Sequence, residues 1–187
     1  IMQRRNTLIK LIVPQRHGDH RGFFAETYSR CKYFELGIDV EFVQDNHSLS
    51  KDVGTLRGLH FQAPPHAQAK LVRCGRGSIF DVAVDIRFGS PTYGQWEGYE
   101  LTAENGHQLF VPVGFAHGFV TLEPDSELVY KCSDYYAPET EGSVIWNDPG
   151  IGIDWPSEAE PILSDKDMAA PLLADFESPF VFGENSE

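Results

Sequence analysis

The sequence predicts an all-β domain, either a sandwich or a barrel. Helical periodicity is scarce, whereas short strand-like runs follow one another along most of the chain. Gly, Pro, Asn and Asp separate these runs, which is the usual pattern of domains built from many short strands and turns. No repeat, low-complexity tract or linker interrupts the 187 residues, so we expect one domain, residues 1–187.

The expected strands lie between residues 8 and 136. The run 70–87 is long enough for two strands, and the Gly-Arg-Gly sequence at 75–77 predicts that they form a β-hairpin. We expect strands within the segments 8–14, 39–46, 55–62, 70–87, 94–102, 107–123 and 126–136.

Two short helices interrupt the strands. One is expected from Ser29 to Leu36, because Gly37 is a good residue to end a helix. The other follows Ser164, whose spacing to Asp167 resembles a capping box, and Pro171 limits its length.

The composition is that of an ordinary soluble globular protein, with 41% hydrophobic and 23% charged residues. No apolar run approaches the ~20 residues that span a bilayer. The N-terminus has basic residues but no signal-peptide apolar core. The three cysteines, Cys31, Cys74 and Cys132, are widely separated, which argues against a disulfide framework or a structural zinc site. We therefore expect a cytoplasmic protein.

The formal net charge of −13 argues against nonspecific binding to nucleic acid or to an anionic membrane. It does not exclude a small anionic ligand, because a few cations gathered around one phosphate group determine the local field.

The segment 55–62, TLRGLHFQ, places a cation and an imidazole on one expected strand. In a regular strand Arg57 and Leu59 would share one face, and Gly58 and His60 the other. Gly58 leaves room for a ligand or another backbone to approach closely. His60 is a candidate for metal-free acid–base chemistry, or else a core histidine bonded to a backbone carbonyl.

The order Pro112, Gly114, His117 resembles the second motif of the cupin superfamily, although a turn followed by an incidental histidine gives the same pattern. The first cupin metal motif offers two histidines one residue apart, but here Gln62 follows His60. His66 and His107 are expected in exposed loops. No two-histidine, one-carboxylate set with comparable spacing can be assembled, so we do not expect a metal site.

Three further residues have both a chemical and a structural interpretation. Lys70 opens an expected strand and would face Arg57 across the sheet. Tyr130 is a candidate proton donor, or else a packed aromatic. Asp167 either orients a histidine or only caps its helix.

Nine segments, in this order and with this spacing, resemble one known family. They are RGFFAETY, FVQDNHSLS, TLRGLHFQ, AKLVR, GSIFDVAVDIR, GSPTYGQW, FVPVGFAHGF, YKCSDYY and EGSVIWNDP. Over roughly residues 7–172 the chain closely resembles the dTDP-4-dehydrorhamnose 3,5-epimerases.

The resemblance implies a cupin jelly roll (a double-stranded β-helix) with a few short helices, assembled as a homodimer without metal or other cofactor. It implies epimerisation of a dTDP-4-keto-6-deoxy sugar at C3 and C5, which gives dTDP-4-dehydrorhamnose. A mono-epimerase acting at C3 or C5 alone remains an alternative. So do a silent cupin that only binds nucleotide sugars and a metal-dependent cupin enzyme.

The resemblance also assigns roles to residues. His60 matches the catalytic base, Asp167 the carboxylate paired with it, and Tyr130 the proton donor on the opposite face of the sugar. Lys70 matches a cation near the sugar's C4 oxygen. Tyr136 matches an aromatic that stacks on thymine, and some nucleotide contacts reach the partner subunit's ligand. The expected substrate-binding residues are Arg21, Glu26, Gln44, Asn46, Arg57, His117, Tyr136, Glu141 and Lys166.

One departure from the family concerns the nucleotide. Family members commonly carry an aromatic residue, usually Phe, where this chain has His17. The imidazole ring of His17 is smaller than a phenyl ring and can carry charge, which puts the preference for a particular nucleotide base in question. His17 therefore joins the expected substrate-binding residues. The tail beyond residue 172 carries no feature to which the sequence assigns a role.

Overall fold

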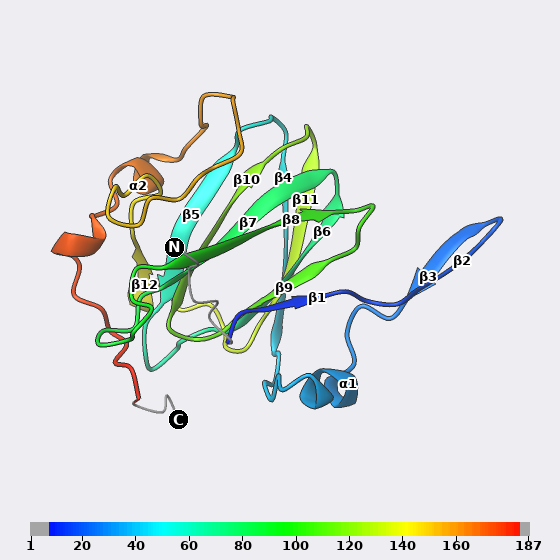
Figure 1. The fold of residues 1–187 in the computed structure, drawn as a ribbon, viewed down its shortest axis with the longest axis horizontal. Helices are drawn as coiled ribbons and strands as arrows, with labels where there is room; N and C mark the ends of the chain where they lie inside the picture. Colours follow the sequence, from blue (N-terminus) through cyan, green and yellow to red (C-terminus); the bar gives the residue numbers. More distant parts are fainter. Residues whose placement is uncertain (1–7, 184–187) are drawn as a thin grey trace.

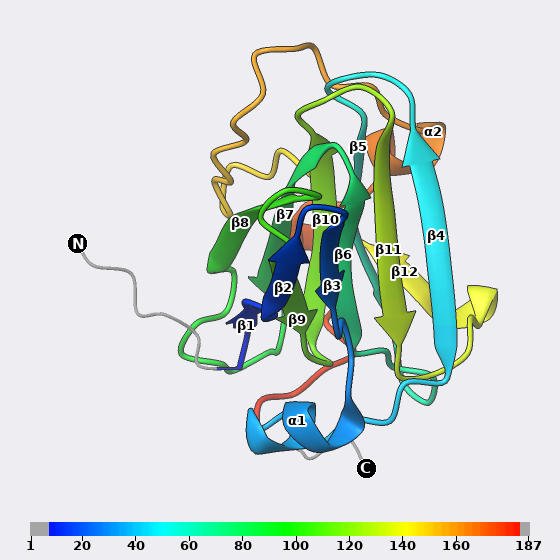
Figure 2. The same ribbon diagram turned by 90° about the vertical axis from the view of Figure 1, so that its right-hand side faces the viewer.

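Two five-stranded antiparallel sheets face each other in the computed structural model, which describes residues 8–183 (Figures 1 and 2). The first sheet has the order β1 (Lys10–Ile12), β9 (Gln108–Val111), β6 (Lys70–Arg76), β11 (Ser126–Cys132) and β4 (Gln44–Ser50). The second has the order β12 (Glu141–Ser143), β5 (Leu56–Gln62), β10 (Phe115–Thr121), β7 (Ser78–Asp85) and β8 (Trp96–Thr102). Both α-helices of the described part are short, α1 (Arg30–Glu35) and α2 (Asp165–Met168).

Successive strands cross repeatedly from one sheet to the other, which is the arrangement of a jelly roll. The predicted all-β fold is therefore confirmed. The predicted hairpin at 75–77 is wrong, because β6 pairs with β9 and β11 whereas β7 pairs with β10 and β8. Gly77, with a φ of 75°, turns the chain against Ser126 and sends it across to the other sheet.

Both faces of the second sheet are buried. Its inner face meets the first sheet in a core that includes Ile79, Ala83 and Phe119 from one side and Val72 and Leu128 from the other. Because each strand alternates its side chains between two faces, β7 turns Val82 and Val84 to the outside. The chain after β12 covers that outer face.

The C-terminal segment, to which no role was assigned from the sequence, is part of this cover. The rings of Phe176 and Phe180 lie 5.3 and 5.9 Å from the ring of Phe61 on β5. Val181 forms a parallel bridge with Phe88. Residues 1–7 and 184–187 lie outside the described part of the chain.

Both predicted helices are confirmed. Ser29 is the N-cap of α1, and Gly37 follows its end with a φ of 76°. Ser164 is the N-cap of α2 and accepts a hydrogen bond from the Asp167 backbone N–H. No helix among the described residues is long and apolar enough to cross a membrane.

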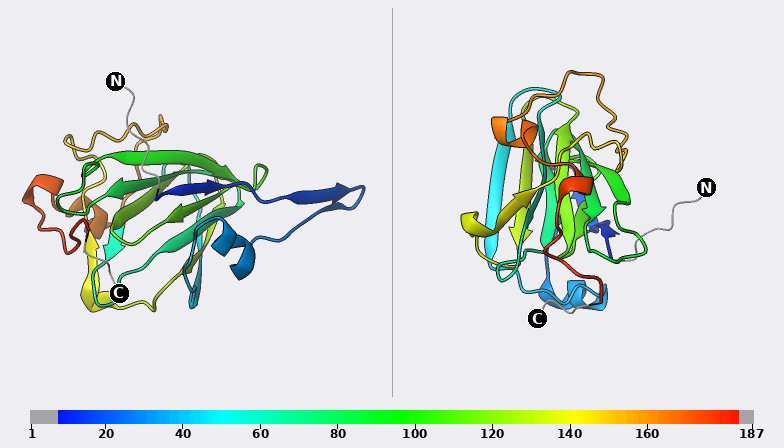
Figure 3. Two further views of the ribbon diagram at one scale, coloured as in Figure 1. Left: turned by 60° about the horizontal axis from the view of Figure 1, so that its bottom comes forward. Right: turned by 90° about the vertical axis from the view of Figure 1, so that its left-hand side faces the viewer.

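Three strands have no counterpart among the expected ones: the short β12, which pairs with β5, and the two strands of a hairpin near the N-terminus. The strands β2 (Arg16–Asp19) and β3 (Gly22–Ala25) form a two-stranded hairpin, here called the arm. Figures 1 and 3 show the arm extending away from the two sheets. Short polar strands with an Asp-His-Arg-Gly turn lack the apolar alternation that marks a half-buried strand.

Candidate active site

A cavity of about 500 Å³ opens between the two sheets. It lies at the end of the sheets where α2 is beside β5, an arrangement of elements that Figure 1 shows. It gathers many of the polar residues that the sequence singled out. The second sheet contributes Arg57, His60, His117 and Phe119; the first contributes Ser48, Lys70, Leu128 and Tyr130; the segment leading into α2 contributes Ile162, Leu163, Ser164, Lys166 and Asp167.

The strand that carries Arg57 and His60 is irregular. A regular strand would separate these two side chains onto opposite faces, yet both line the cavity. The register between β5 and β10 shifts beside Gly58, whose φ is 140°. A Cβ at this position would lie 2.5 Å from the Cα of Gly118. Gly58 therefore accommodates another backbone rather than a ligand.

His60 is hydrogen-bonded to a buried carboxylate. Its Nε2 lies 2.5 Å from Asp167 Oδ1, and the Ser164 hydroxyl donates to Asp167 Oδ2 at 2.8 Å. Asp167 thus has both of its suggested roles, because its backbone N–H bonds the cap while its carboxylate orients the histidine. Since a carboxylate accepts, Nε2 carries the proton and Nδ1 keeps the free lone pair.

Burial lowers the pKa of His60 below its ordinary value of 6.5, and the charges of Lys70 and Lys166 act in the same direction. The hydrogen bond and charge of Asp167 raise the pKa but do not cancel the burial. The imidazole is therefore neutral at pH 7, which is the form that accepts a proton.

Tyr130 reaches the cavity from the opposite sheet. Burial raises the pKa of its phenol above the ordinary value of 10.0, although a hydrogen bond with Asn46 and the charge of Arg57 lower it. The hydroxyl therefore holds its proton at neutral pH and can donate it.

Lys70 is not across one sheet from Arg57, as the sequence suggested. It lies on β6 of the first sheet and faces Arg57 across the cavity from the other sheet. Burial lowers its pKa from the ordinary value of 10.5, and the nearby Cys132, Asp81 and Glu141 oppose this shift.

His117 lines the same cavity and is held from behind by Asp81. The distance from His117 Nε2 to Asp81 Oδ1 is 2.8 Å, and both side chains are buried. Sequence reasoning missed Asp81. A carboxylate within the apolar run Ile79–Val84 was the available signal, because a buried acid requires a partner.

A second polar group lies at the rim. Lys166 Nζ forms a 2.6 Å ion pair with Glu141, and the hydroxyl of Tyr136 lies 3.3 Å from the same carboxylate. The backbone N–H of Tyr136 donates to Gln44 Oε1 at 2.9 Å, and Gln44 donates to Asn46 at 3.0 Å. Together these contacts connect the expected nucleotide residues to Asn46, which bonds Tyr130.

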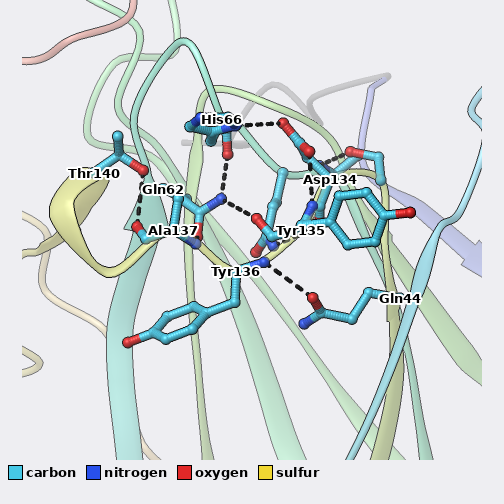
Figure 4. Close-up of polar contacts among 11 residues, drawn as sticks. Gln44, Gln62, His66, Asp134, Tyr135, Tyr136, Ala137 and Thr140 are labelled. Atoms are coloured by element: carbon cyan, nitrogen blue, oxygen red, sulfur yellow. Dashed lines mark hydrogen bonds and ion pairs between the residues drawn. The ribbon is translucent and has the colours of Figure 1, made fainter.

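Gln62 holds the loop that presents Tyr136 (Figure 4). Its amide nitrogen donates to the carbonyls of His66 and Tyr135, and its oxygen accepts from the Ala137 N–H at 3.0 Å. The position where a metal-binding cupin would place a second histidine is thus used to fix a loop.

The histidines weighed as metal ligands in the sequence do not come together. His66 forms a 3.2 Å contact with Asp134, and His107 lies in the chain just before β9. Within residues 8–183, no three His, Cys, Asp or Glu side chains form a group that would hold a metal ion.

His17 and Arg21 on the arm, and Glu26 just after it, do not line this cavity. Arg21 pairs with Asp19 at 2.5 Å, and Glu26 pairs with Lys32 at 2.8 Å. His17 and Arg21 instead line a shallow hollow of about 230 Å³ on the arm itself. Within one chain, the structure therefore separates these three expected binding residues from the rest.

A family model described as dTDP-4-dehydrorhamnose 3,5-epimerase matches residues 7–175. The chain belongs to this family. It is 57% identical over 166 residues to the dTDP-4-dehydrorhamnose 3,5-epimerase of Salmonella typhimurium, covering 88% of this chain and 90% of the relative. A dTDP-4-dehydro-6-deoxyglucose 3-epimerase from a Streptomyces species is 43% identical over 162 residues, covering 86% and 82%.

A solved structure supports the same assignment. The dTDP-6-deoxy-D-glucose-3,5-epimerase of Legionella pneumophila Philadelphia 1, in complex with dTDP-4-keto-L-rhamnose, superposes with a TM-score of 0.88. The identity is 49%, and the match covers 92% of each chain. The cupin jelly roll expected from the resemblance is thereby confirmed, and the chain is an enzyme of the isomerase class.

We predict that Gln62→Met loosens the loop around Tyr136. Three hydrogen bonds to buried or half-buried backbone would be lost, and we expect the free energy of unfolding to fall by about 2 kcal/mol. Urea denaturation measures this loss, and hydrogen exchange at residues 135–137 locates it. Gln68→Met is the matched control, because Gln68 donates a single bond to the Asp134 carbonyl. Equal losses in the two variants would contradict the role of Gln62.

Proposed function

We propose that the protein epimerises dTDP-4-keto-6-deoxyglucose at C3 and C5 to give dTDP-4-dehydrorhamnose. The observation that carries this proposal is the placement of His60 and Tyr130 on facing sheets around one cavity. Inverting a carbon by proton transfer needs a base on one face and an acid on the other. A neutral imidazole and a protonated phenol supply these two groups.

The substrate's ketone makes the reaction accessible. The C–H bonds at C3 and C5 are both α to the C4 carbonyl, so removal of either proton gives an enolate. In the proposed step, Nδ1 of His60 takes the proton and the electron pair moves onto the C4 oxygen. Tyr130 then donates its proton to the opposite face of the carbon, and the imidazolium and tyrosinate return to their starting forms by proton exchange with water.

Two groups support the charges that develop. The carboxylate of Asp167 stabilises the imidazolium of His60. The ammonium of Lys70 offsets charge on the C4 oxygen, and loss of such a donor typically costs ~10²–10³ in rate. Arg57 is the cavity's candidate for the diphosphate, because a guanidinium pairs in a fork with phosphate oxygens.

We further propose a homodimer in which the arm of one subunit completes the site of the other. Phe23 and Phe24 on the arm are 61% and 71% exposed, which supports a partner for this surface. Arg21 would then reach the nucleotide diphosphate, while His17 and Tyr136 would flank the base. We place this enzyme in the cytoplasm as a single epimerase domain; its free cysteines suit a reducing compartment.

A mono-epimerase is the second candidate, favoured by the similarity to the Streptomyces 3-epimerase. The base and the acid would be the same, and the sugar's freedom to turn between them would differ. Incubation of the 4-keto sugar in D₂O decides between the candidates. Deuterium and inversion at both C3 and C5 support the main proposal, and inversion at one carbon supports the mono-epimerase.

We predict that His60→Asn lowers kcat by at least about 10²-fold, because the general base is lost. Binding of dTDP, measured by calorimetry, should persist. In the wild type, kcat/KM should fall as the pH drops through the lowered pKa of His60, with the midpoint of this acidic limb below 6.5. Turnover near wild type in the variant would remove His60 from the mechanism.

For Tyr130→Phe we predict a strong loss of inversion with continued exchange of the substrate's C3 or C5 proton into D₂O. The phenol is needed only after the base has acted, so the enolate still forms and is reprotonated on the original face. NMR of the recovered sugar separates exchange from inversion. Unchanged inversion would contradict the donor role.

Mixing two inactive variants tests the shared site. We predict that Arg21→Ala and His60→Asn, allowed to exchange subunits, recover about a quarter of wild-type activity. Half of the dimers are then mixed, and each mixed dimer has one intact site out of two. No recovery, despite subunit exchange shown by mass spectrometry, would argue that each chain uses its own arm.

A further inference from the structure

Asp81 is a buried carboxylate without a role in the mechanism derived above. Its side chain is 0% exposed, and it lies on β7 on the inner face of the second sheet. Oδ1 accepts from His117, but Oδ2 has no hydrogen-bond partner among the described residues. Burying a carboxylate costs free energy unless hydrogen bonds or opposite charges compensate. Only one of the two oxygens of Asp81 receives a hydrogen bond, so hydrogen bonding offsets this cost only in part.

The neighbours of Asp81 both line the cavity. The Nε2–H of His117 donates to the Asp81 carboxylate, so Nδ1 is the ring atom available to a ligand. Lys70 approaches from the facing sheet, and the charge of Asp81 helps to keep its ammonium protonated against burial. The other titratable or charged groups that act on Lys70 or line the cavity with it are Cys132 and Tyr130 on β11, Glu141 on β12, His60 and Arg57 on β5, and Lys166 and Asp167 on α2.

We propose that Asp81 is a positioning residue that holds His117 in place for the sugar and also supplies a buried counter-charge to the Lys70 ammonium. Through Oδ1 it fixes His117 with Nε2–H turned away from the ligand and Nδ1 ready to accept a hydrogen bond. Its negative charge lies on the sheet that faces Lys70 and, without a direct ion pair, favours the ammonium that meets the enolate oxygen. This inference rests on the proposed epimerase function.

The role differs from that of Asp167. Asp167 stabilises a charge that appears on His60 during the reaction, whereas Asp81 sustains a charge that Lys70 must carry before the reaction begins. A cation held in a buried site without such a counter-ion loses its proton, and a neutral amine is a poor stabiliser of an enolate.

The test compares Asp81→Asn with Asp85→Asn. Both carboxylates are buried on β7, but Asp85 pairs with Arg87 at 2.6 Å and does not line the cavity. For Asp81→Asn we expect a roughly ten- to hundredfold fall in kcat with little change in KM. The alkaline limb of its kcat profile should move to lower pH. Asp85→Asn should lose stability but keep the wild-type profile. A wild-type profile in a folded Asp81→Asn protein would overturn the proposal.

Two NMR measurements test the same role without substrate, and so keep it separate from the proposed function. In ¹⁵N-lysine-labelled protein, the Lys70 ammonium should titrate at lower pH in Asp81→Asn than in the wild type, with Lys70→Met giving the assignment. An unchanged titration would overturn the role of Asp81 as a counter-charge to Lys70. In wild-type protein the His117 ring should carry its proton on Nε2 alone, and a proton on Nδ1 would overturn the proposal even if the Asp81 variant fails to fold.

If the wild type binds dTDP but does not turn over the 4-keto sugar, the proposed function fails. The lysine titration and the histidine ring spectrum would then still decide whether Asp81 positions His117 and favours the charged form of Lys70.

Discussion

The hydrogen bond between His60 and Asp167 joins two parts of the chain that lie 107 residues apart. His60 belongs to the wall of the second sheet, whereas Asp167 belongs to the segment that closes the end of the cavity. The irregular strand at Gly58, the N-cap at Ser164 and the buried carboxylate all serve this one contact. Without it, the imidazole would be an unpaired polar group in a cavity wall, and burial would lower its pKa further.

The site also resolves an apparent conflict of charge. The proposed ligand is anionic, whereas the chain itself has a net charge of −13. Arg57, Lys70 and Lys166 converge on one cavity, so the local charge there can differ in sign from the surface average. Glu141 pairs with the ammonium of Lys166 at the rim, and Asp81 lies behind the cavity wall, where it bonds His117.

Much of this could be predicted from the sequence. The fold class, both helices, and the meeting of His60, Lys70, Tyr130 and Asp167 follow from local patterns and from the family resemblance. The failures have a common cause. The hairpin at 75–77 and the alternation around Gly58 were inferred from neighbours in sequence, but both are decided by pairing with distant strands. The arm and the Asp81–His117 contact likewise depend on tertiary geometry that no local spacing encodes.

The role of Gln62 limits how this barrel could be converted into a metal-binding one. Its amide is already engaged with the loop around Tyr136, although its side chain alternates with Phe61 of the outer face and so lies on the same face of the strand as His60. A histidine placed there would remove the three hydrogen bonds of the amide, and the loop would lose its support. A second histidine beside His60 therefore requires more than one substitution, because the barrel would also need another anchor for the loop around Tyr136.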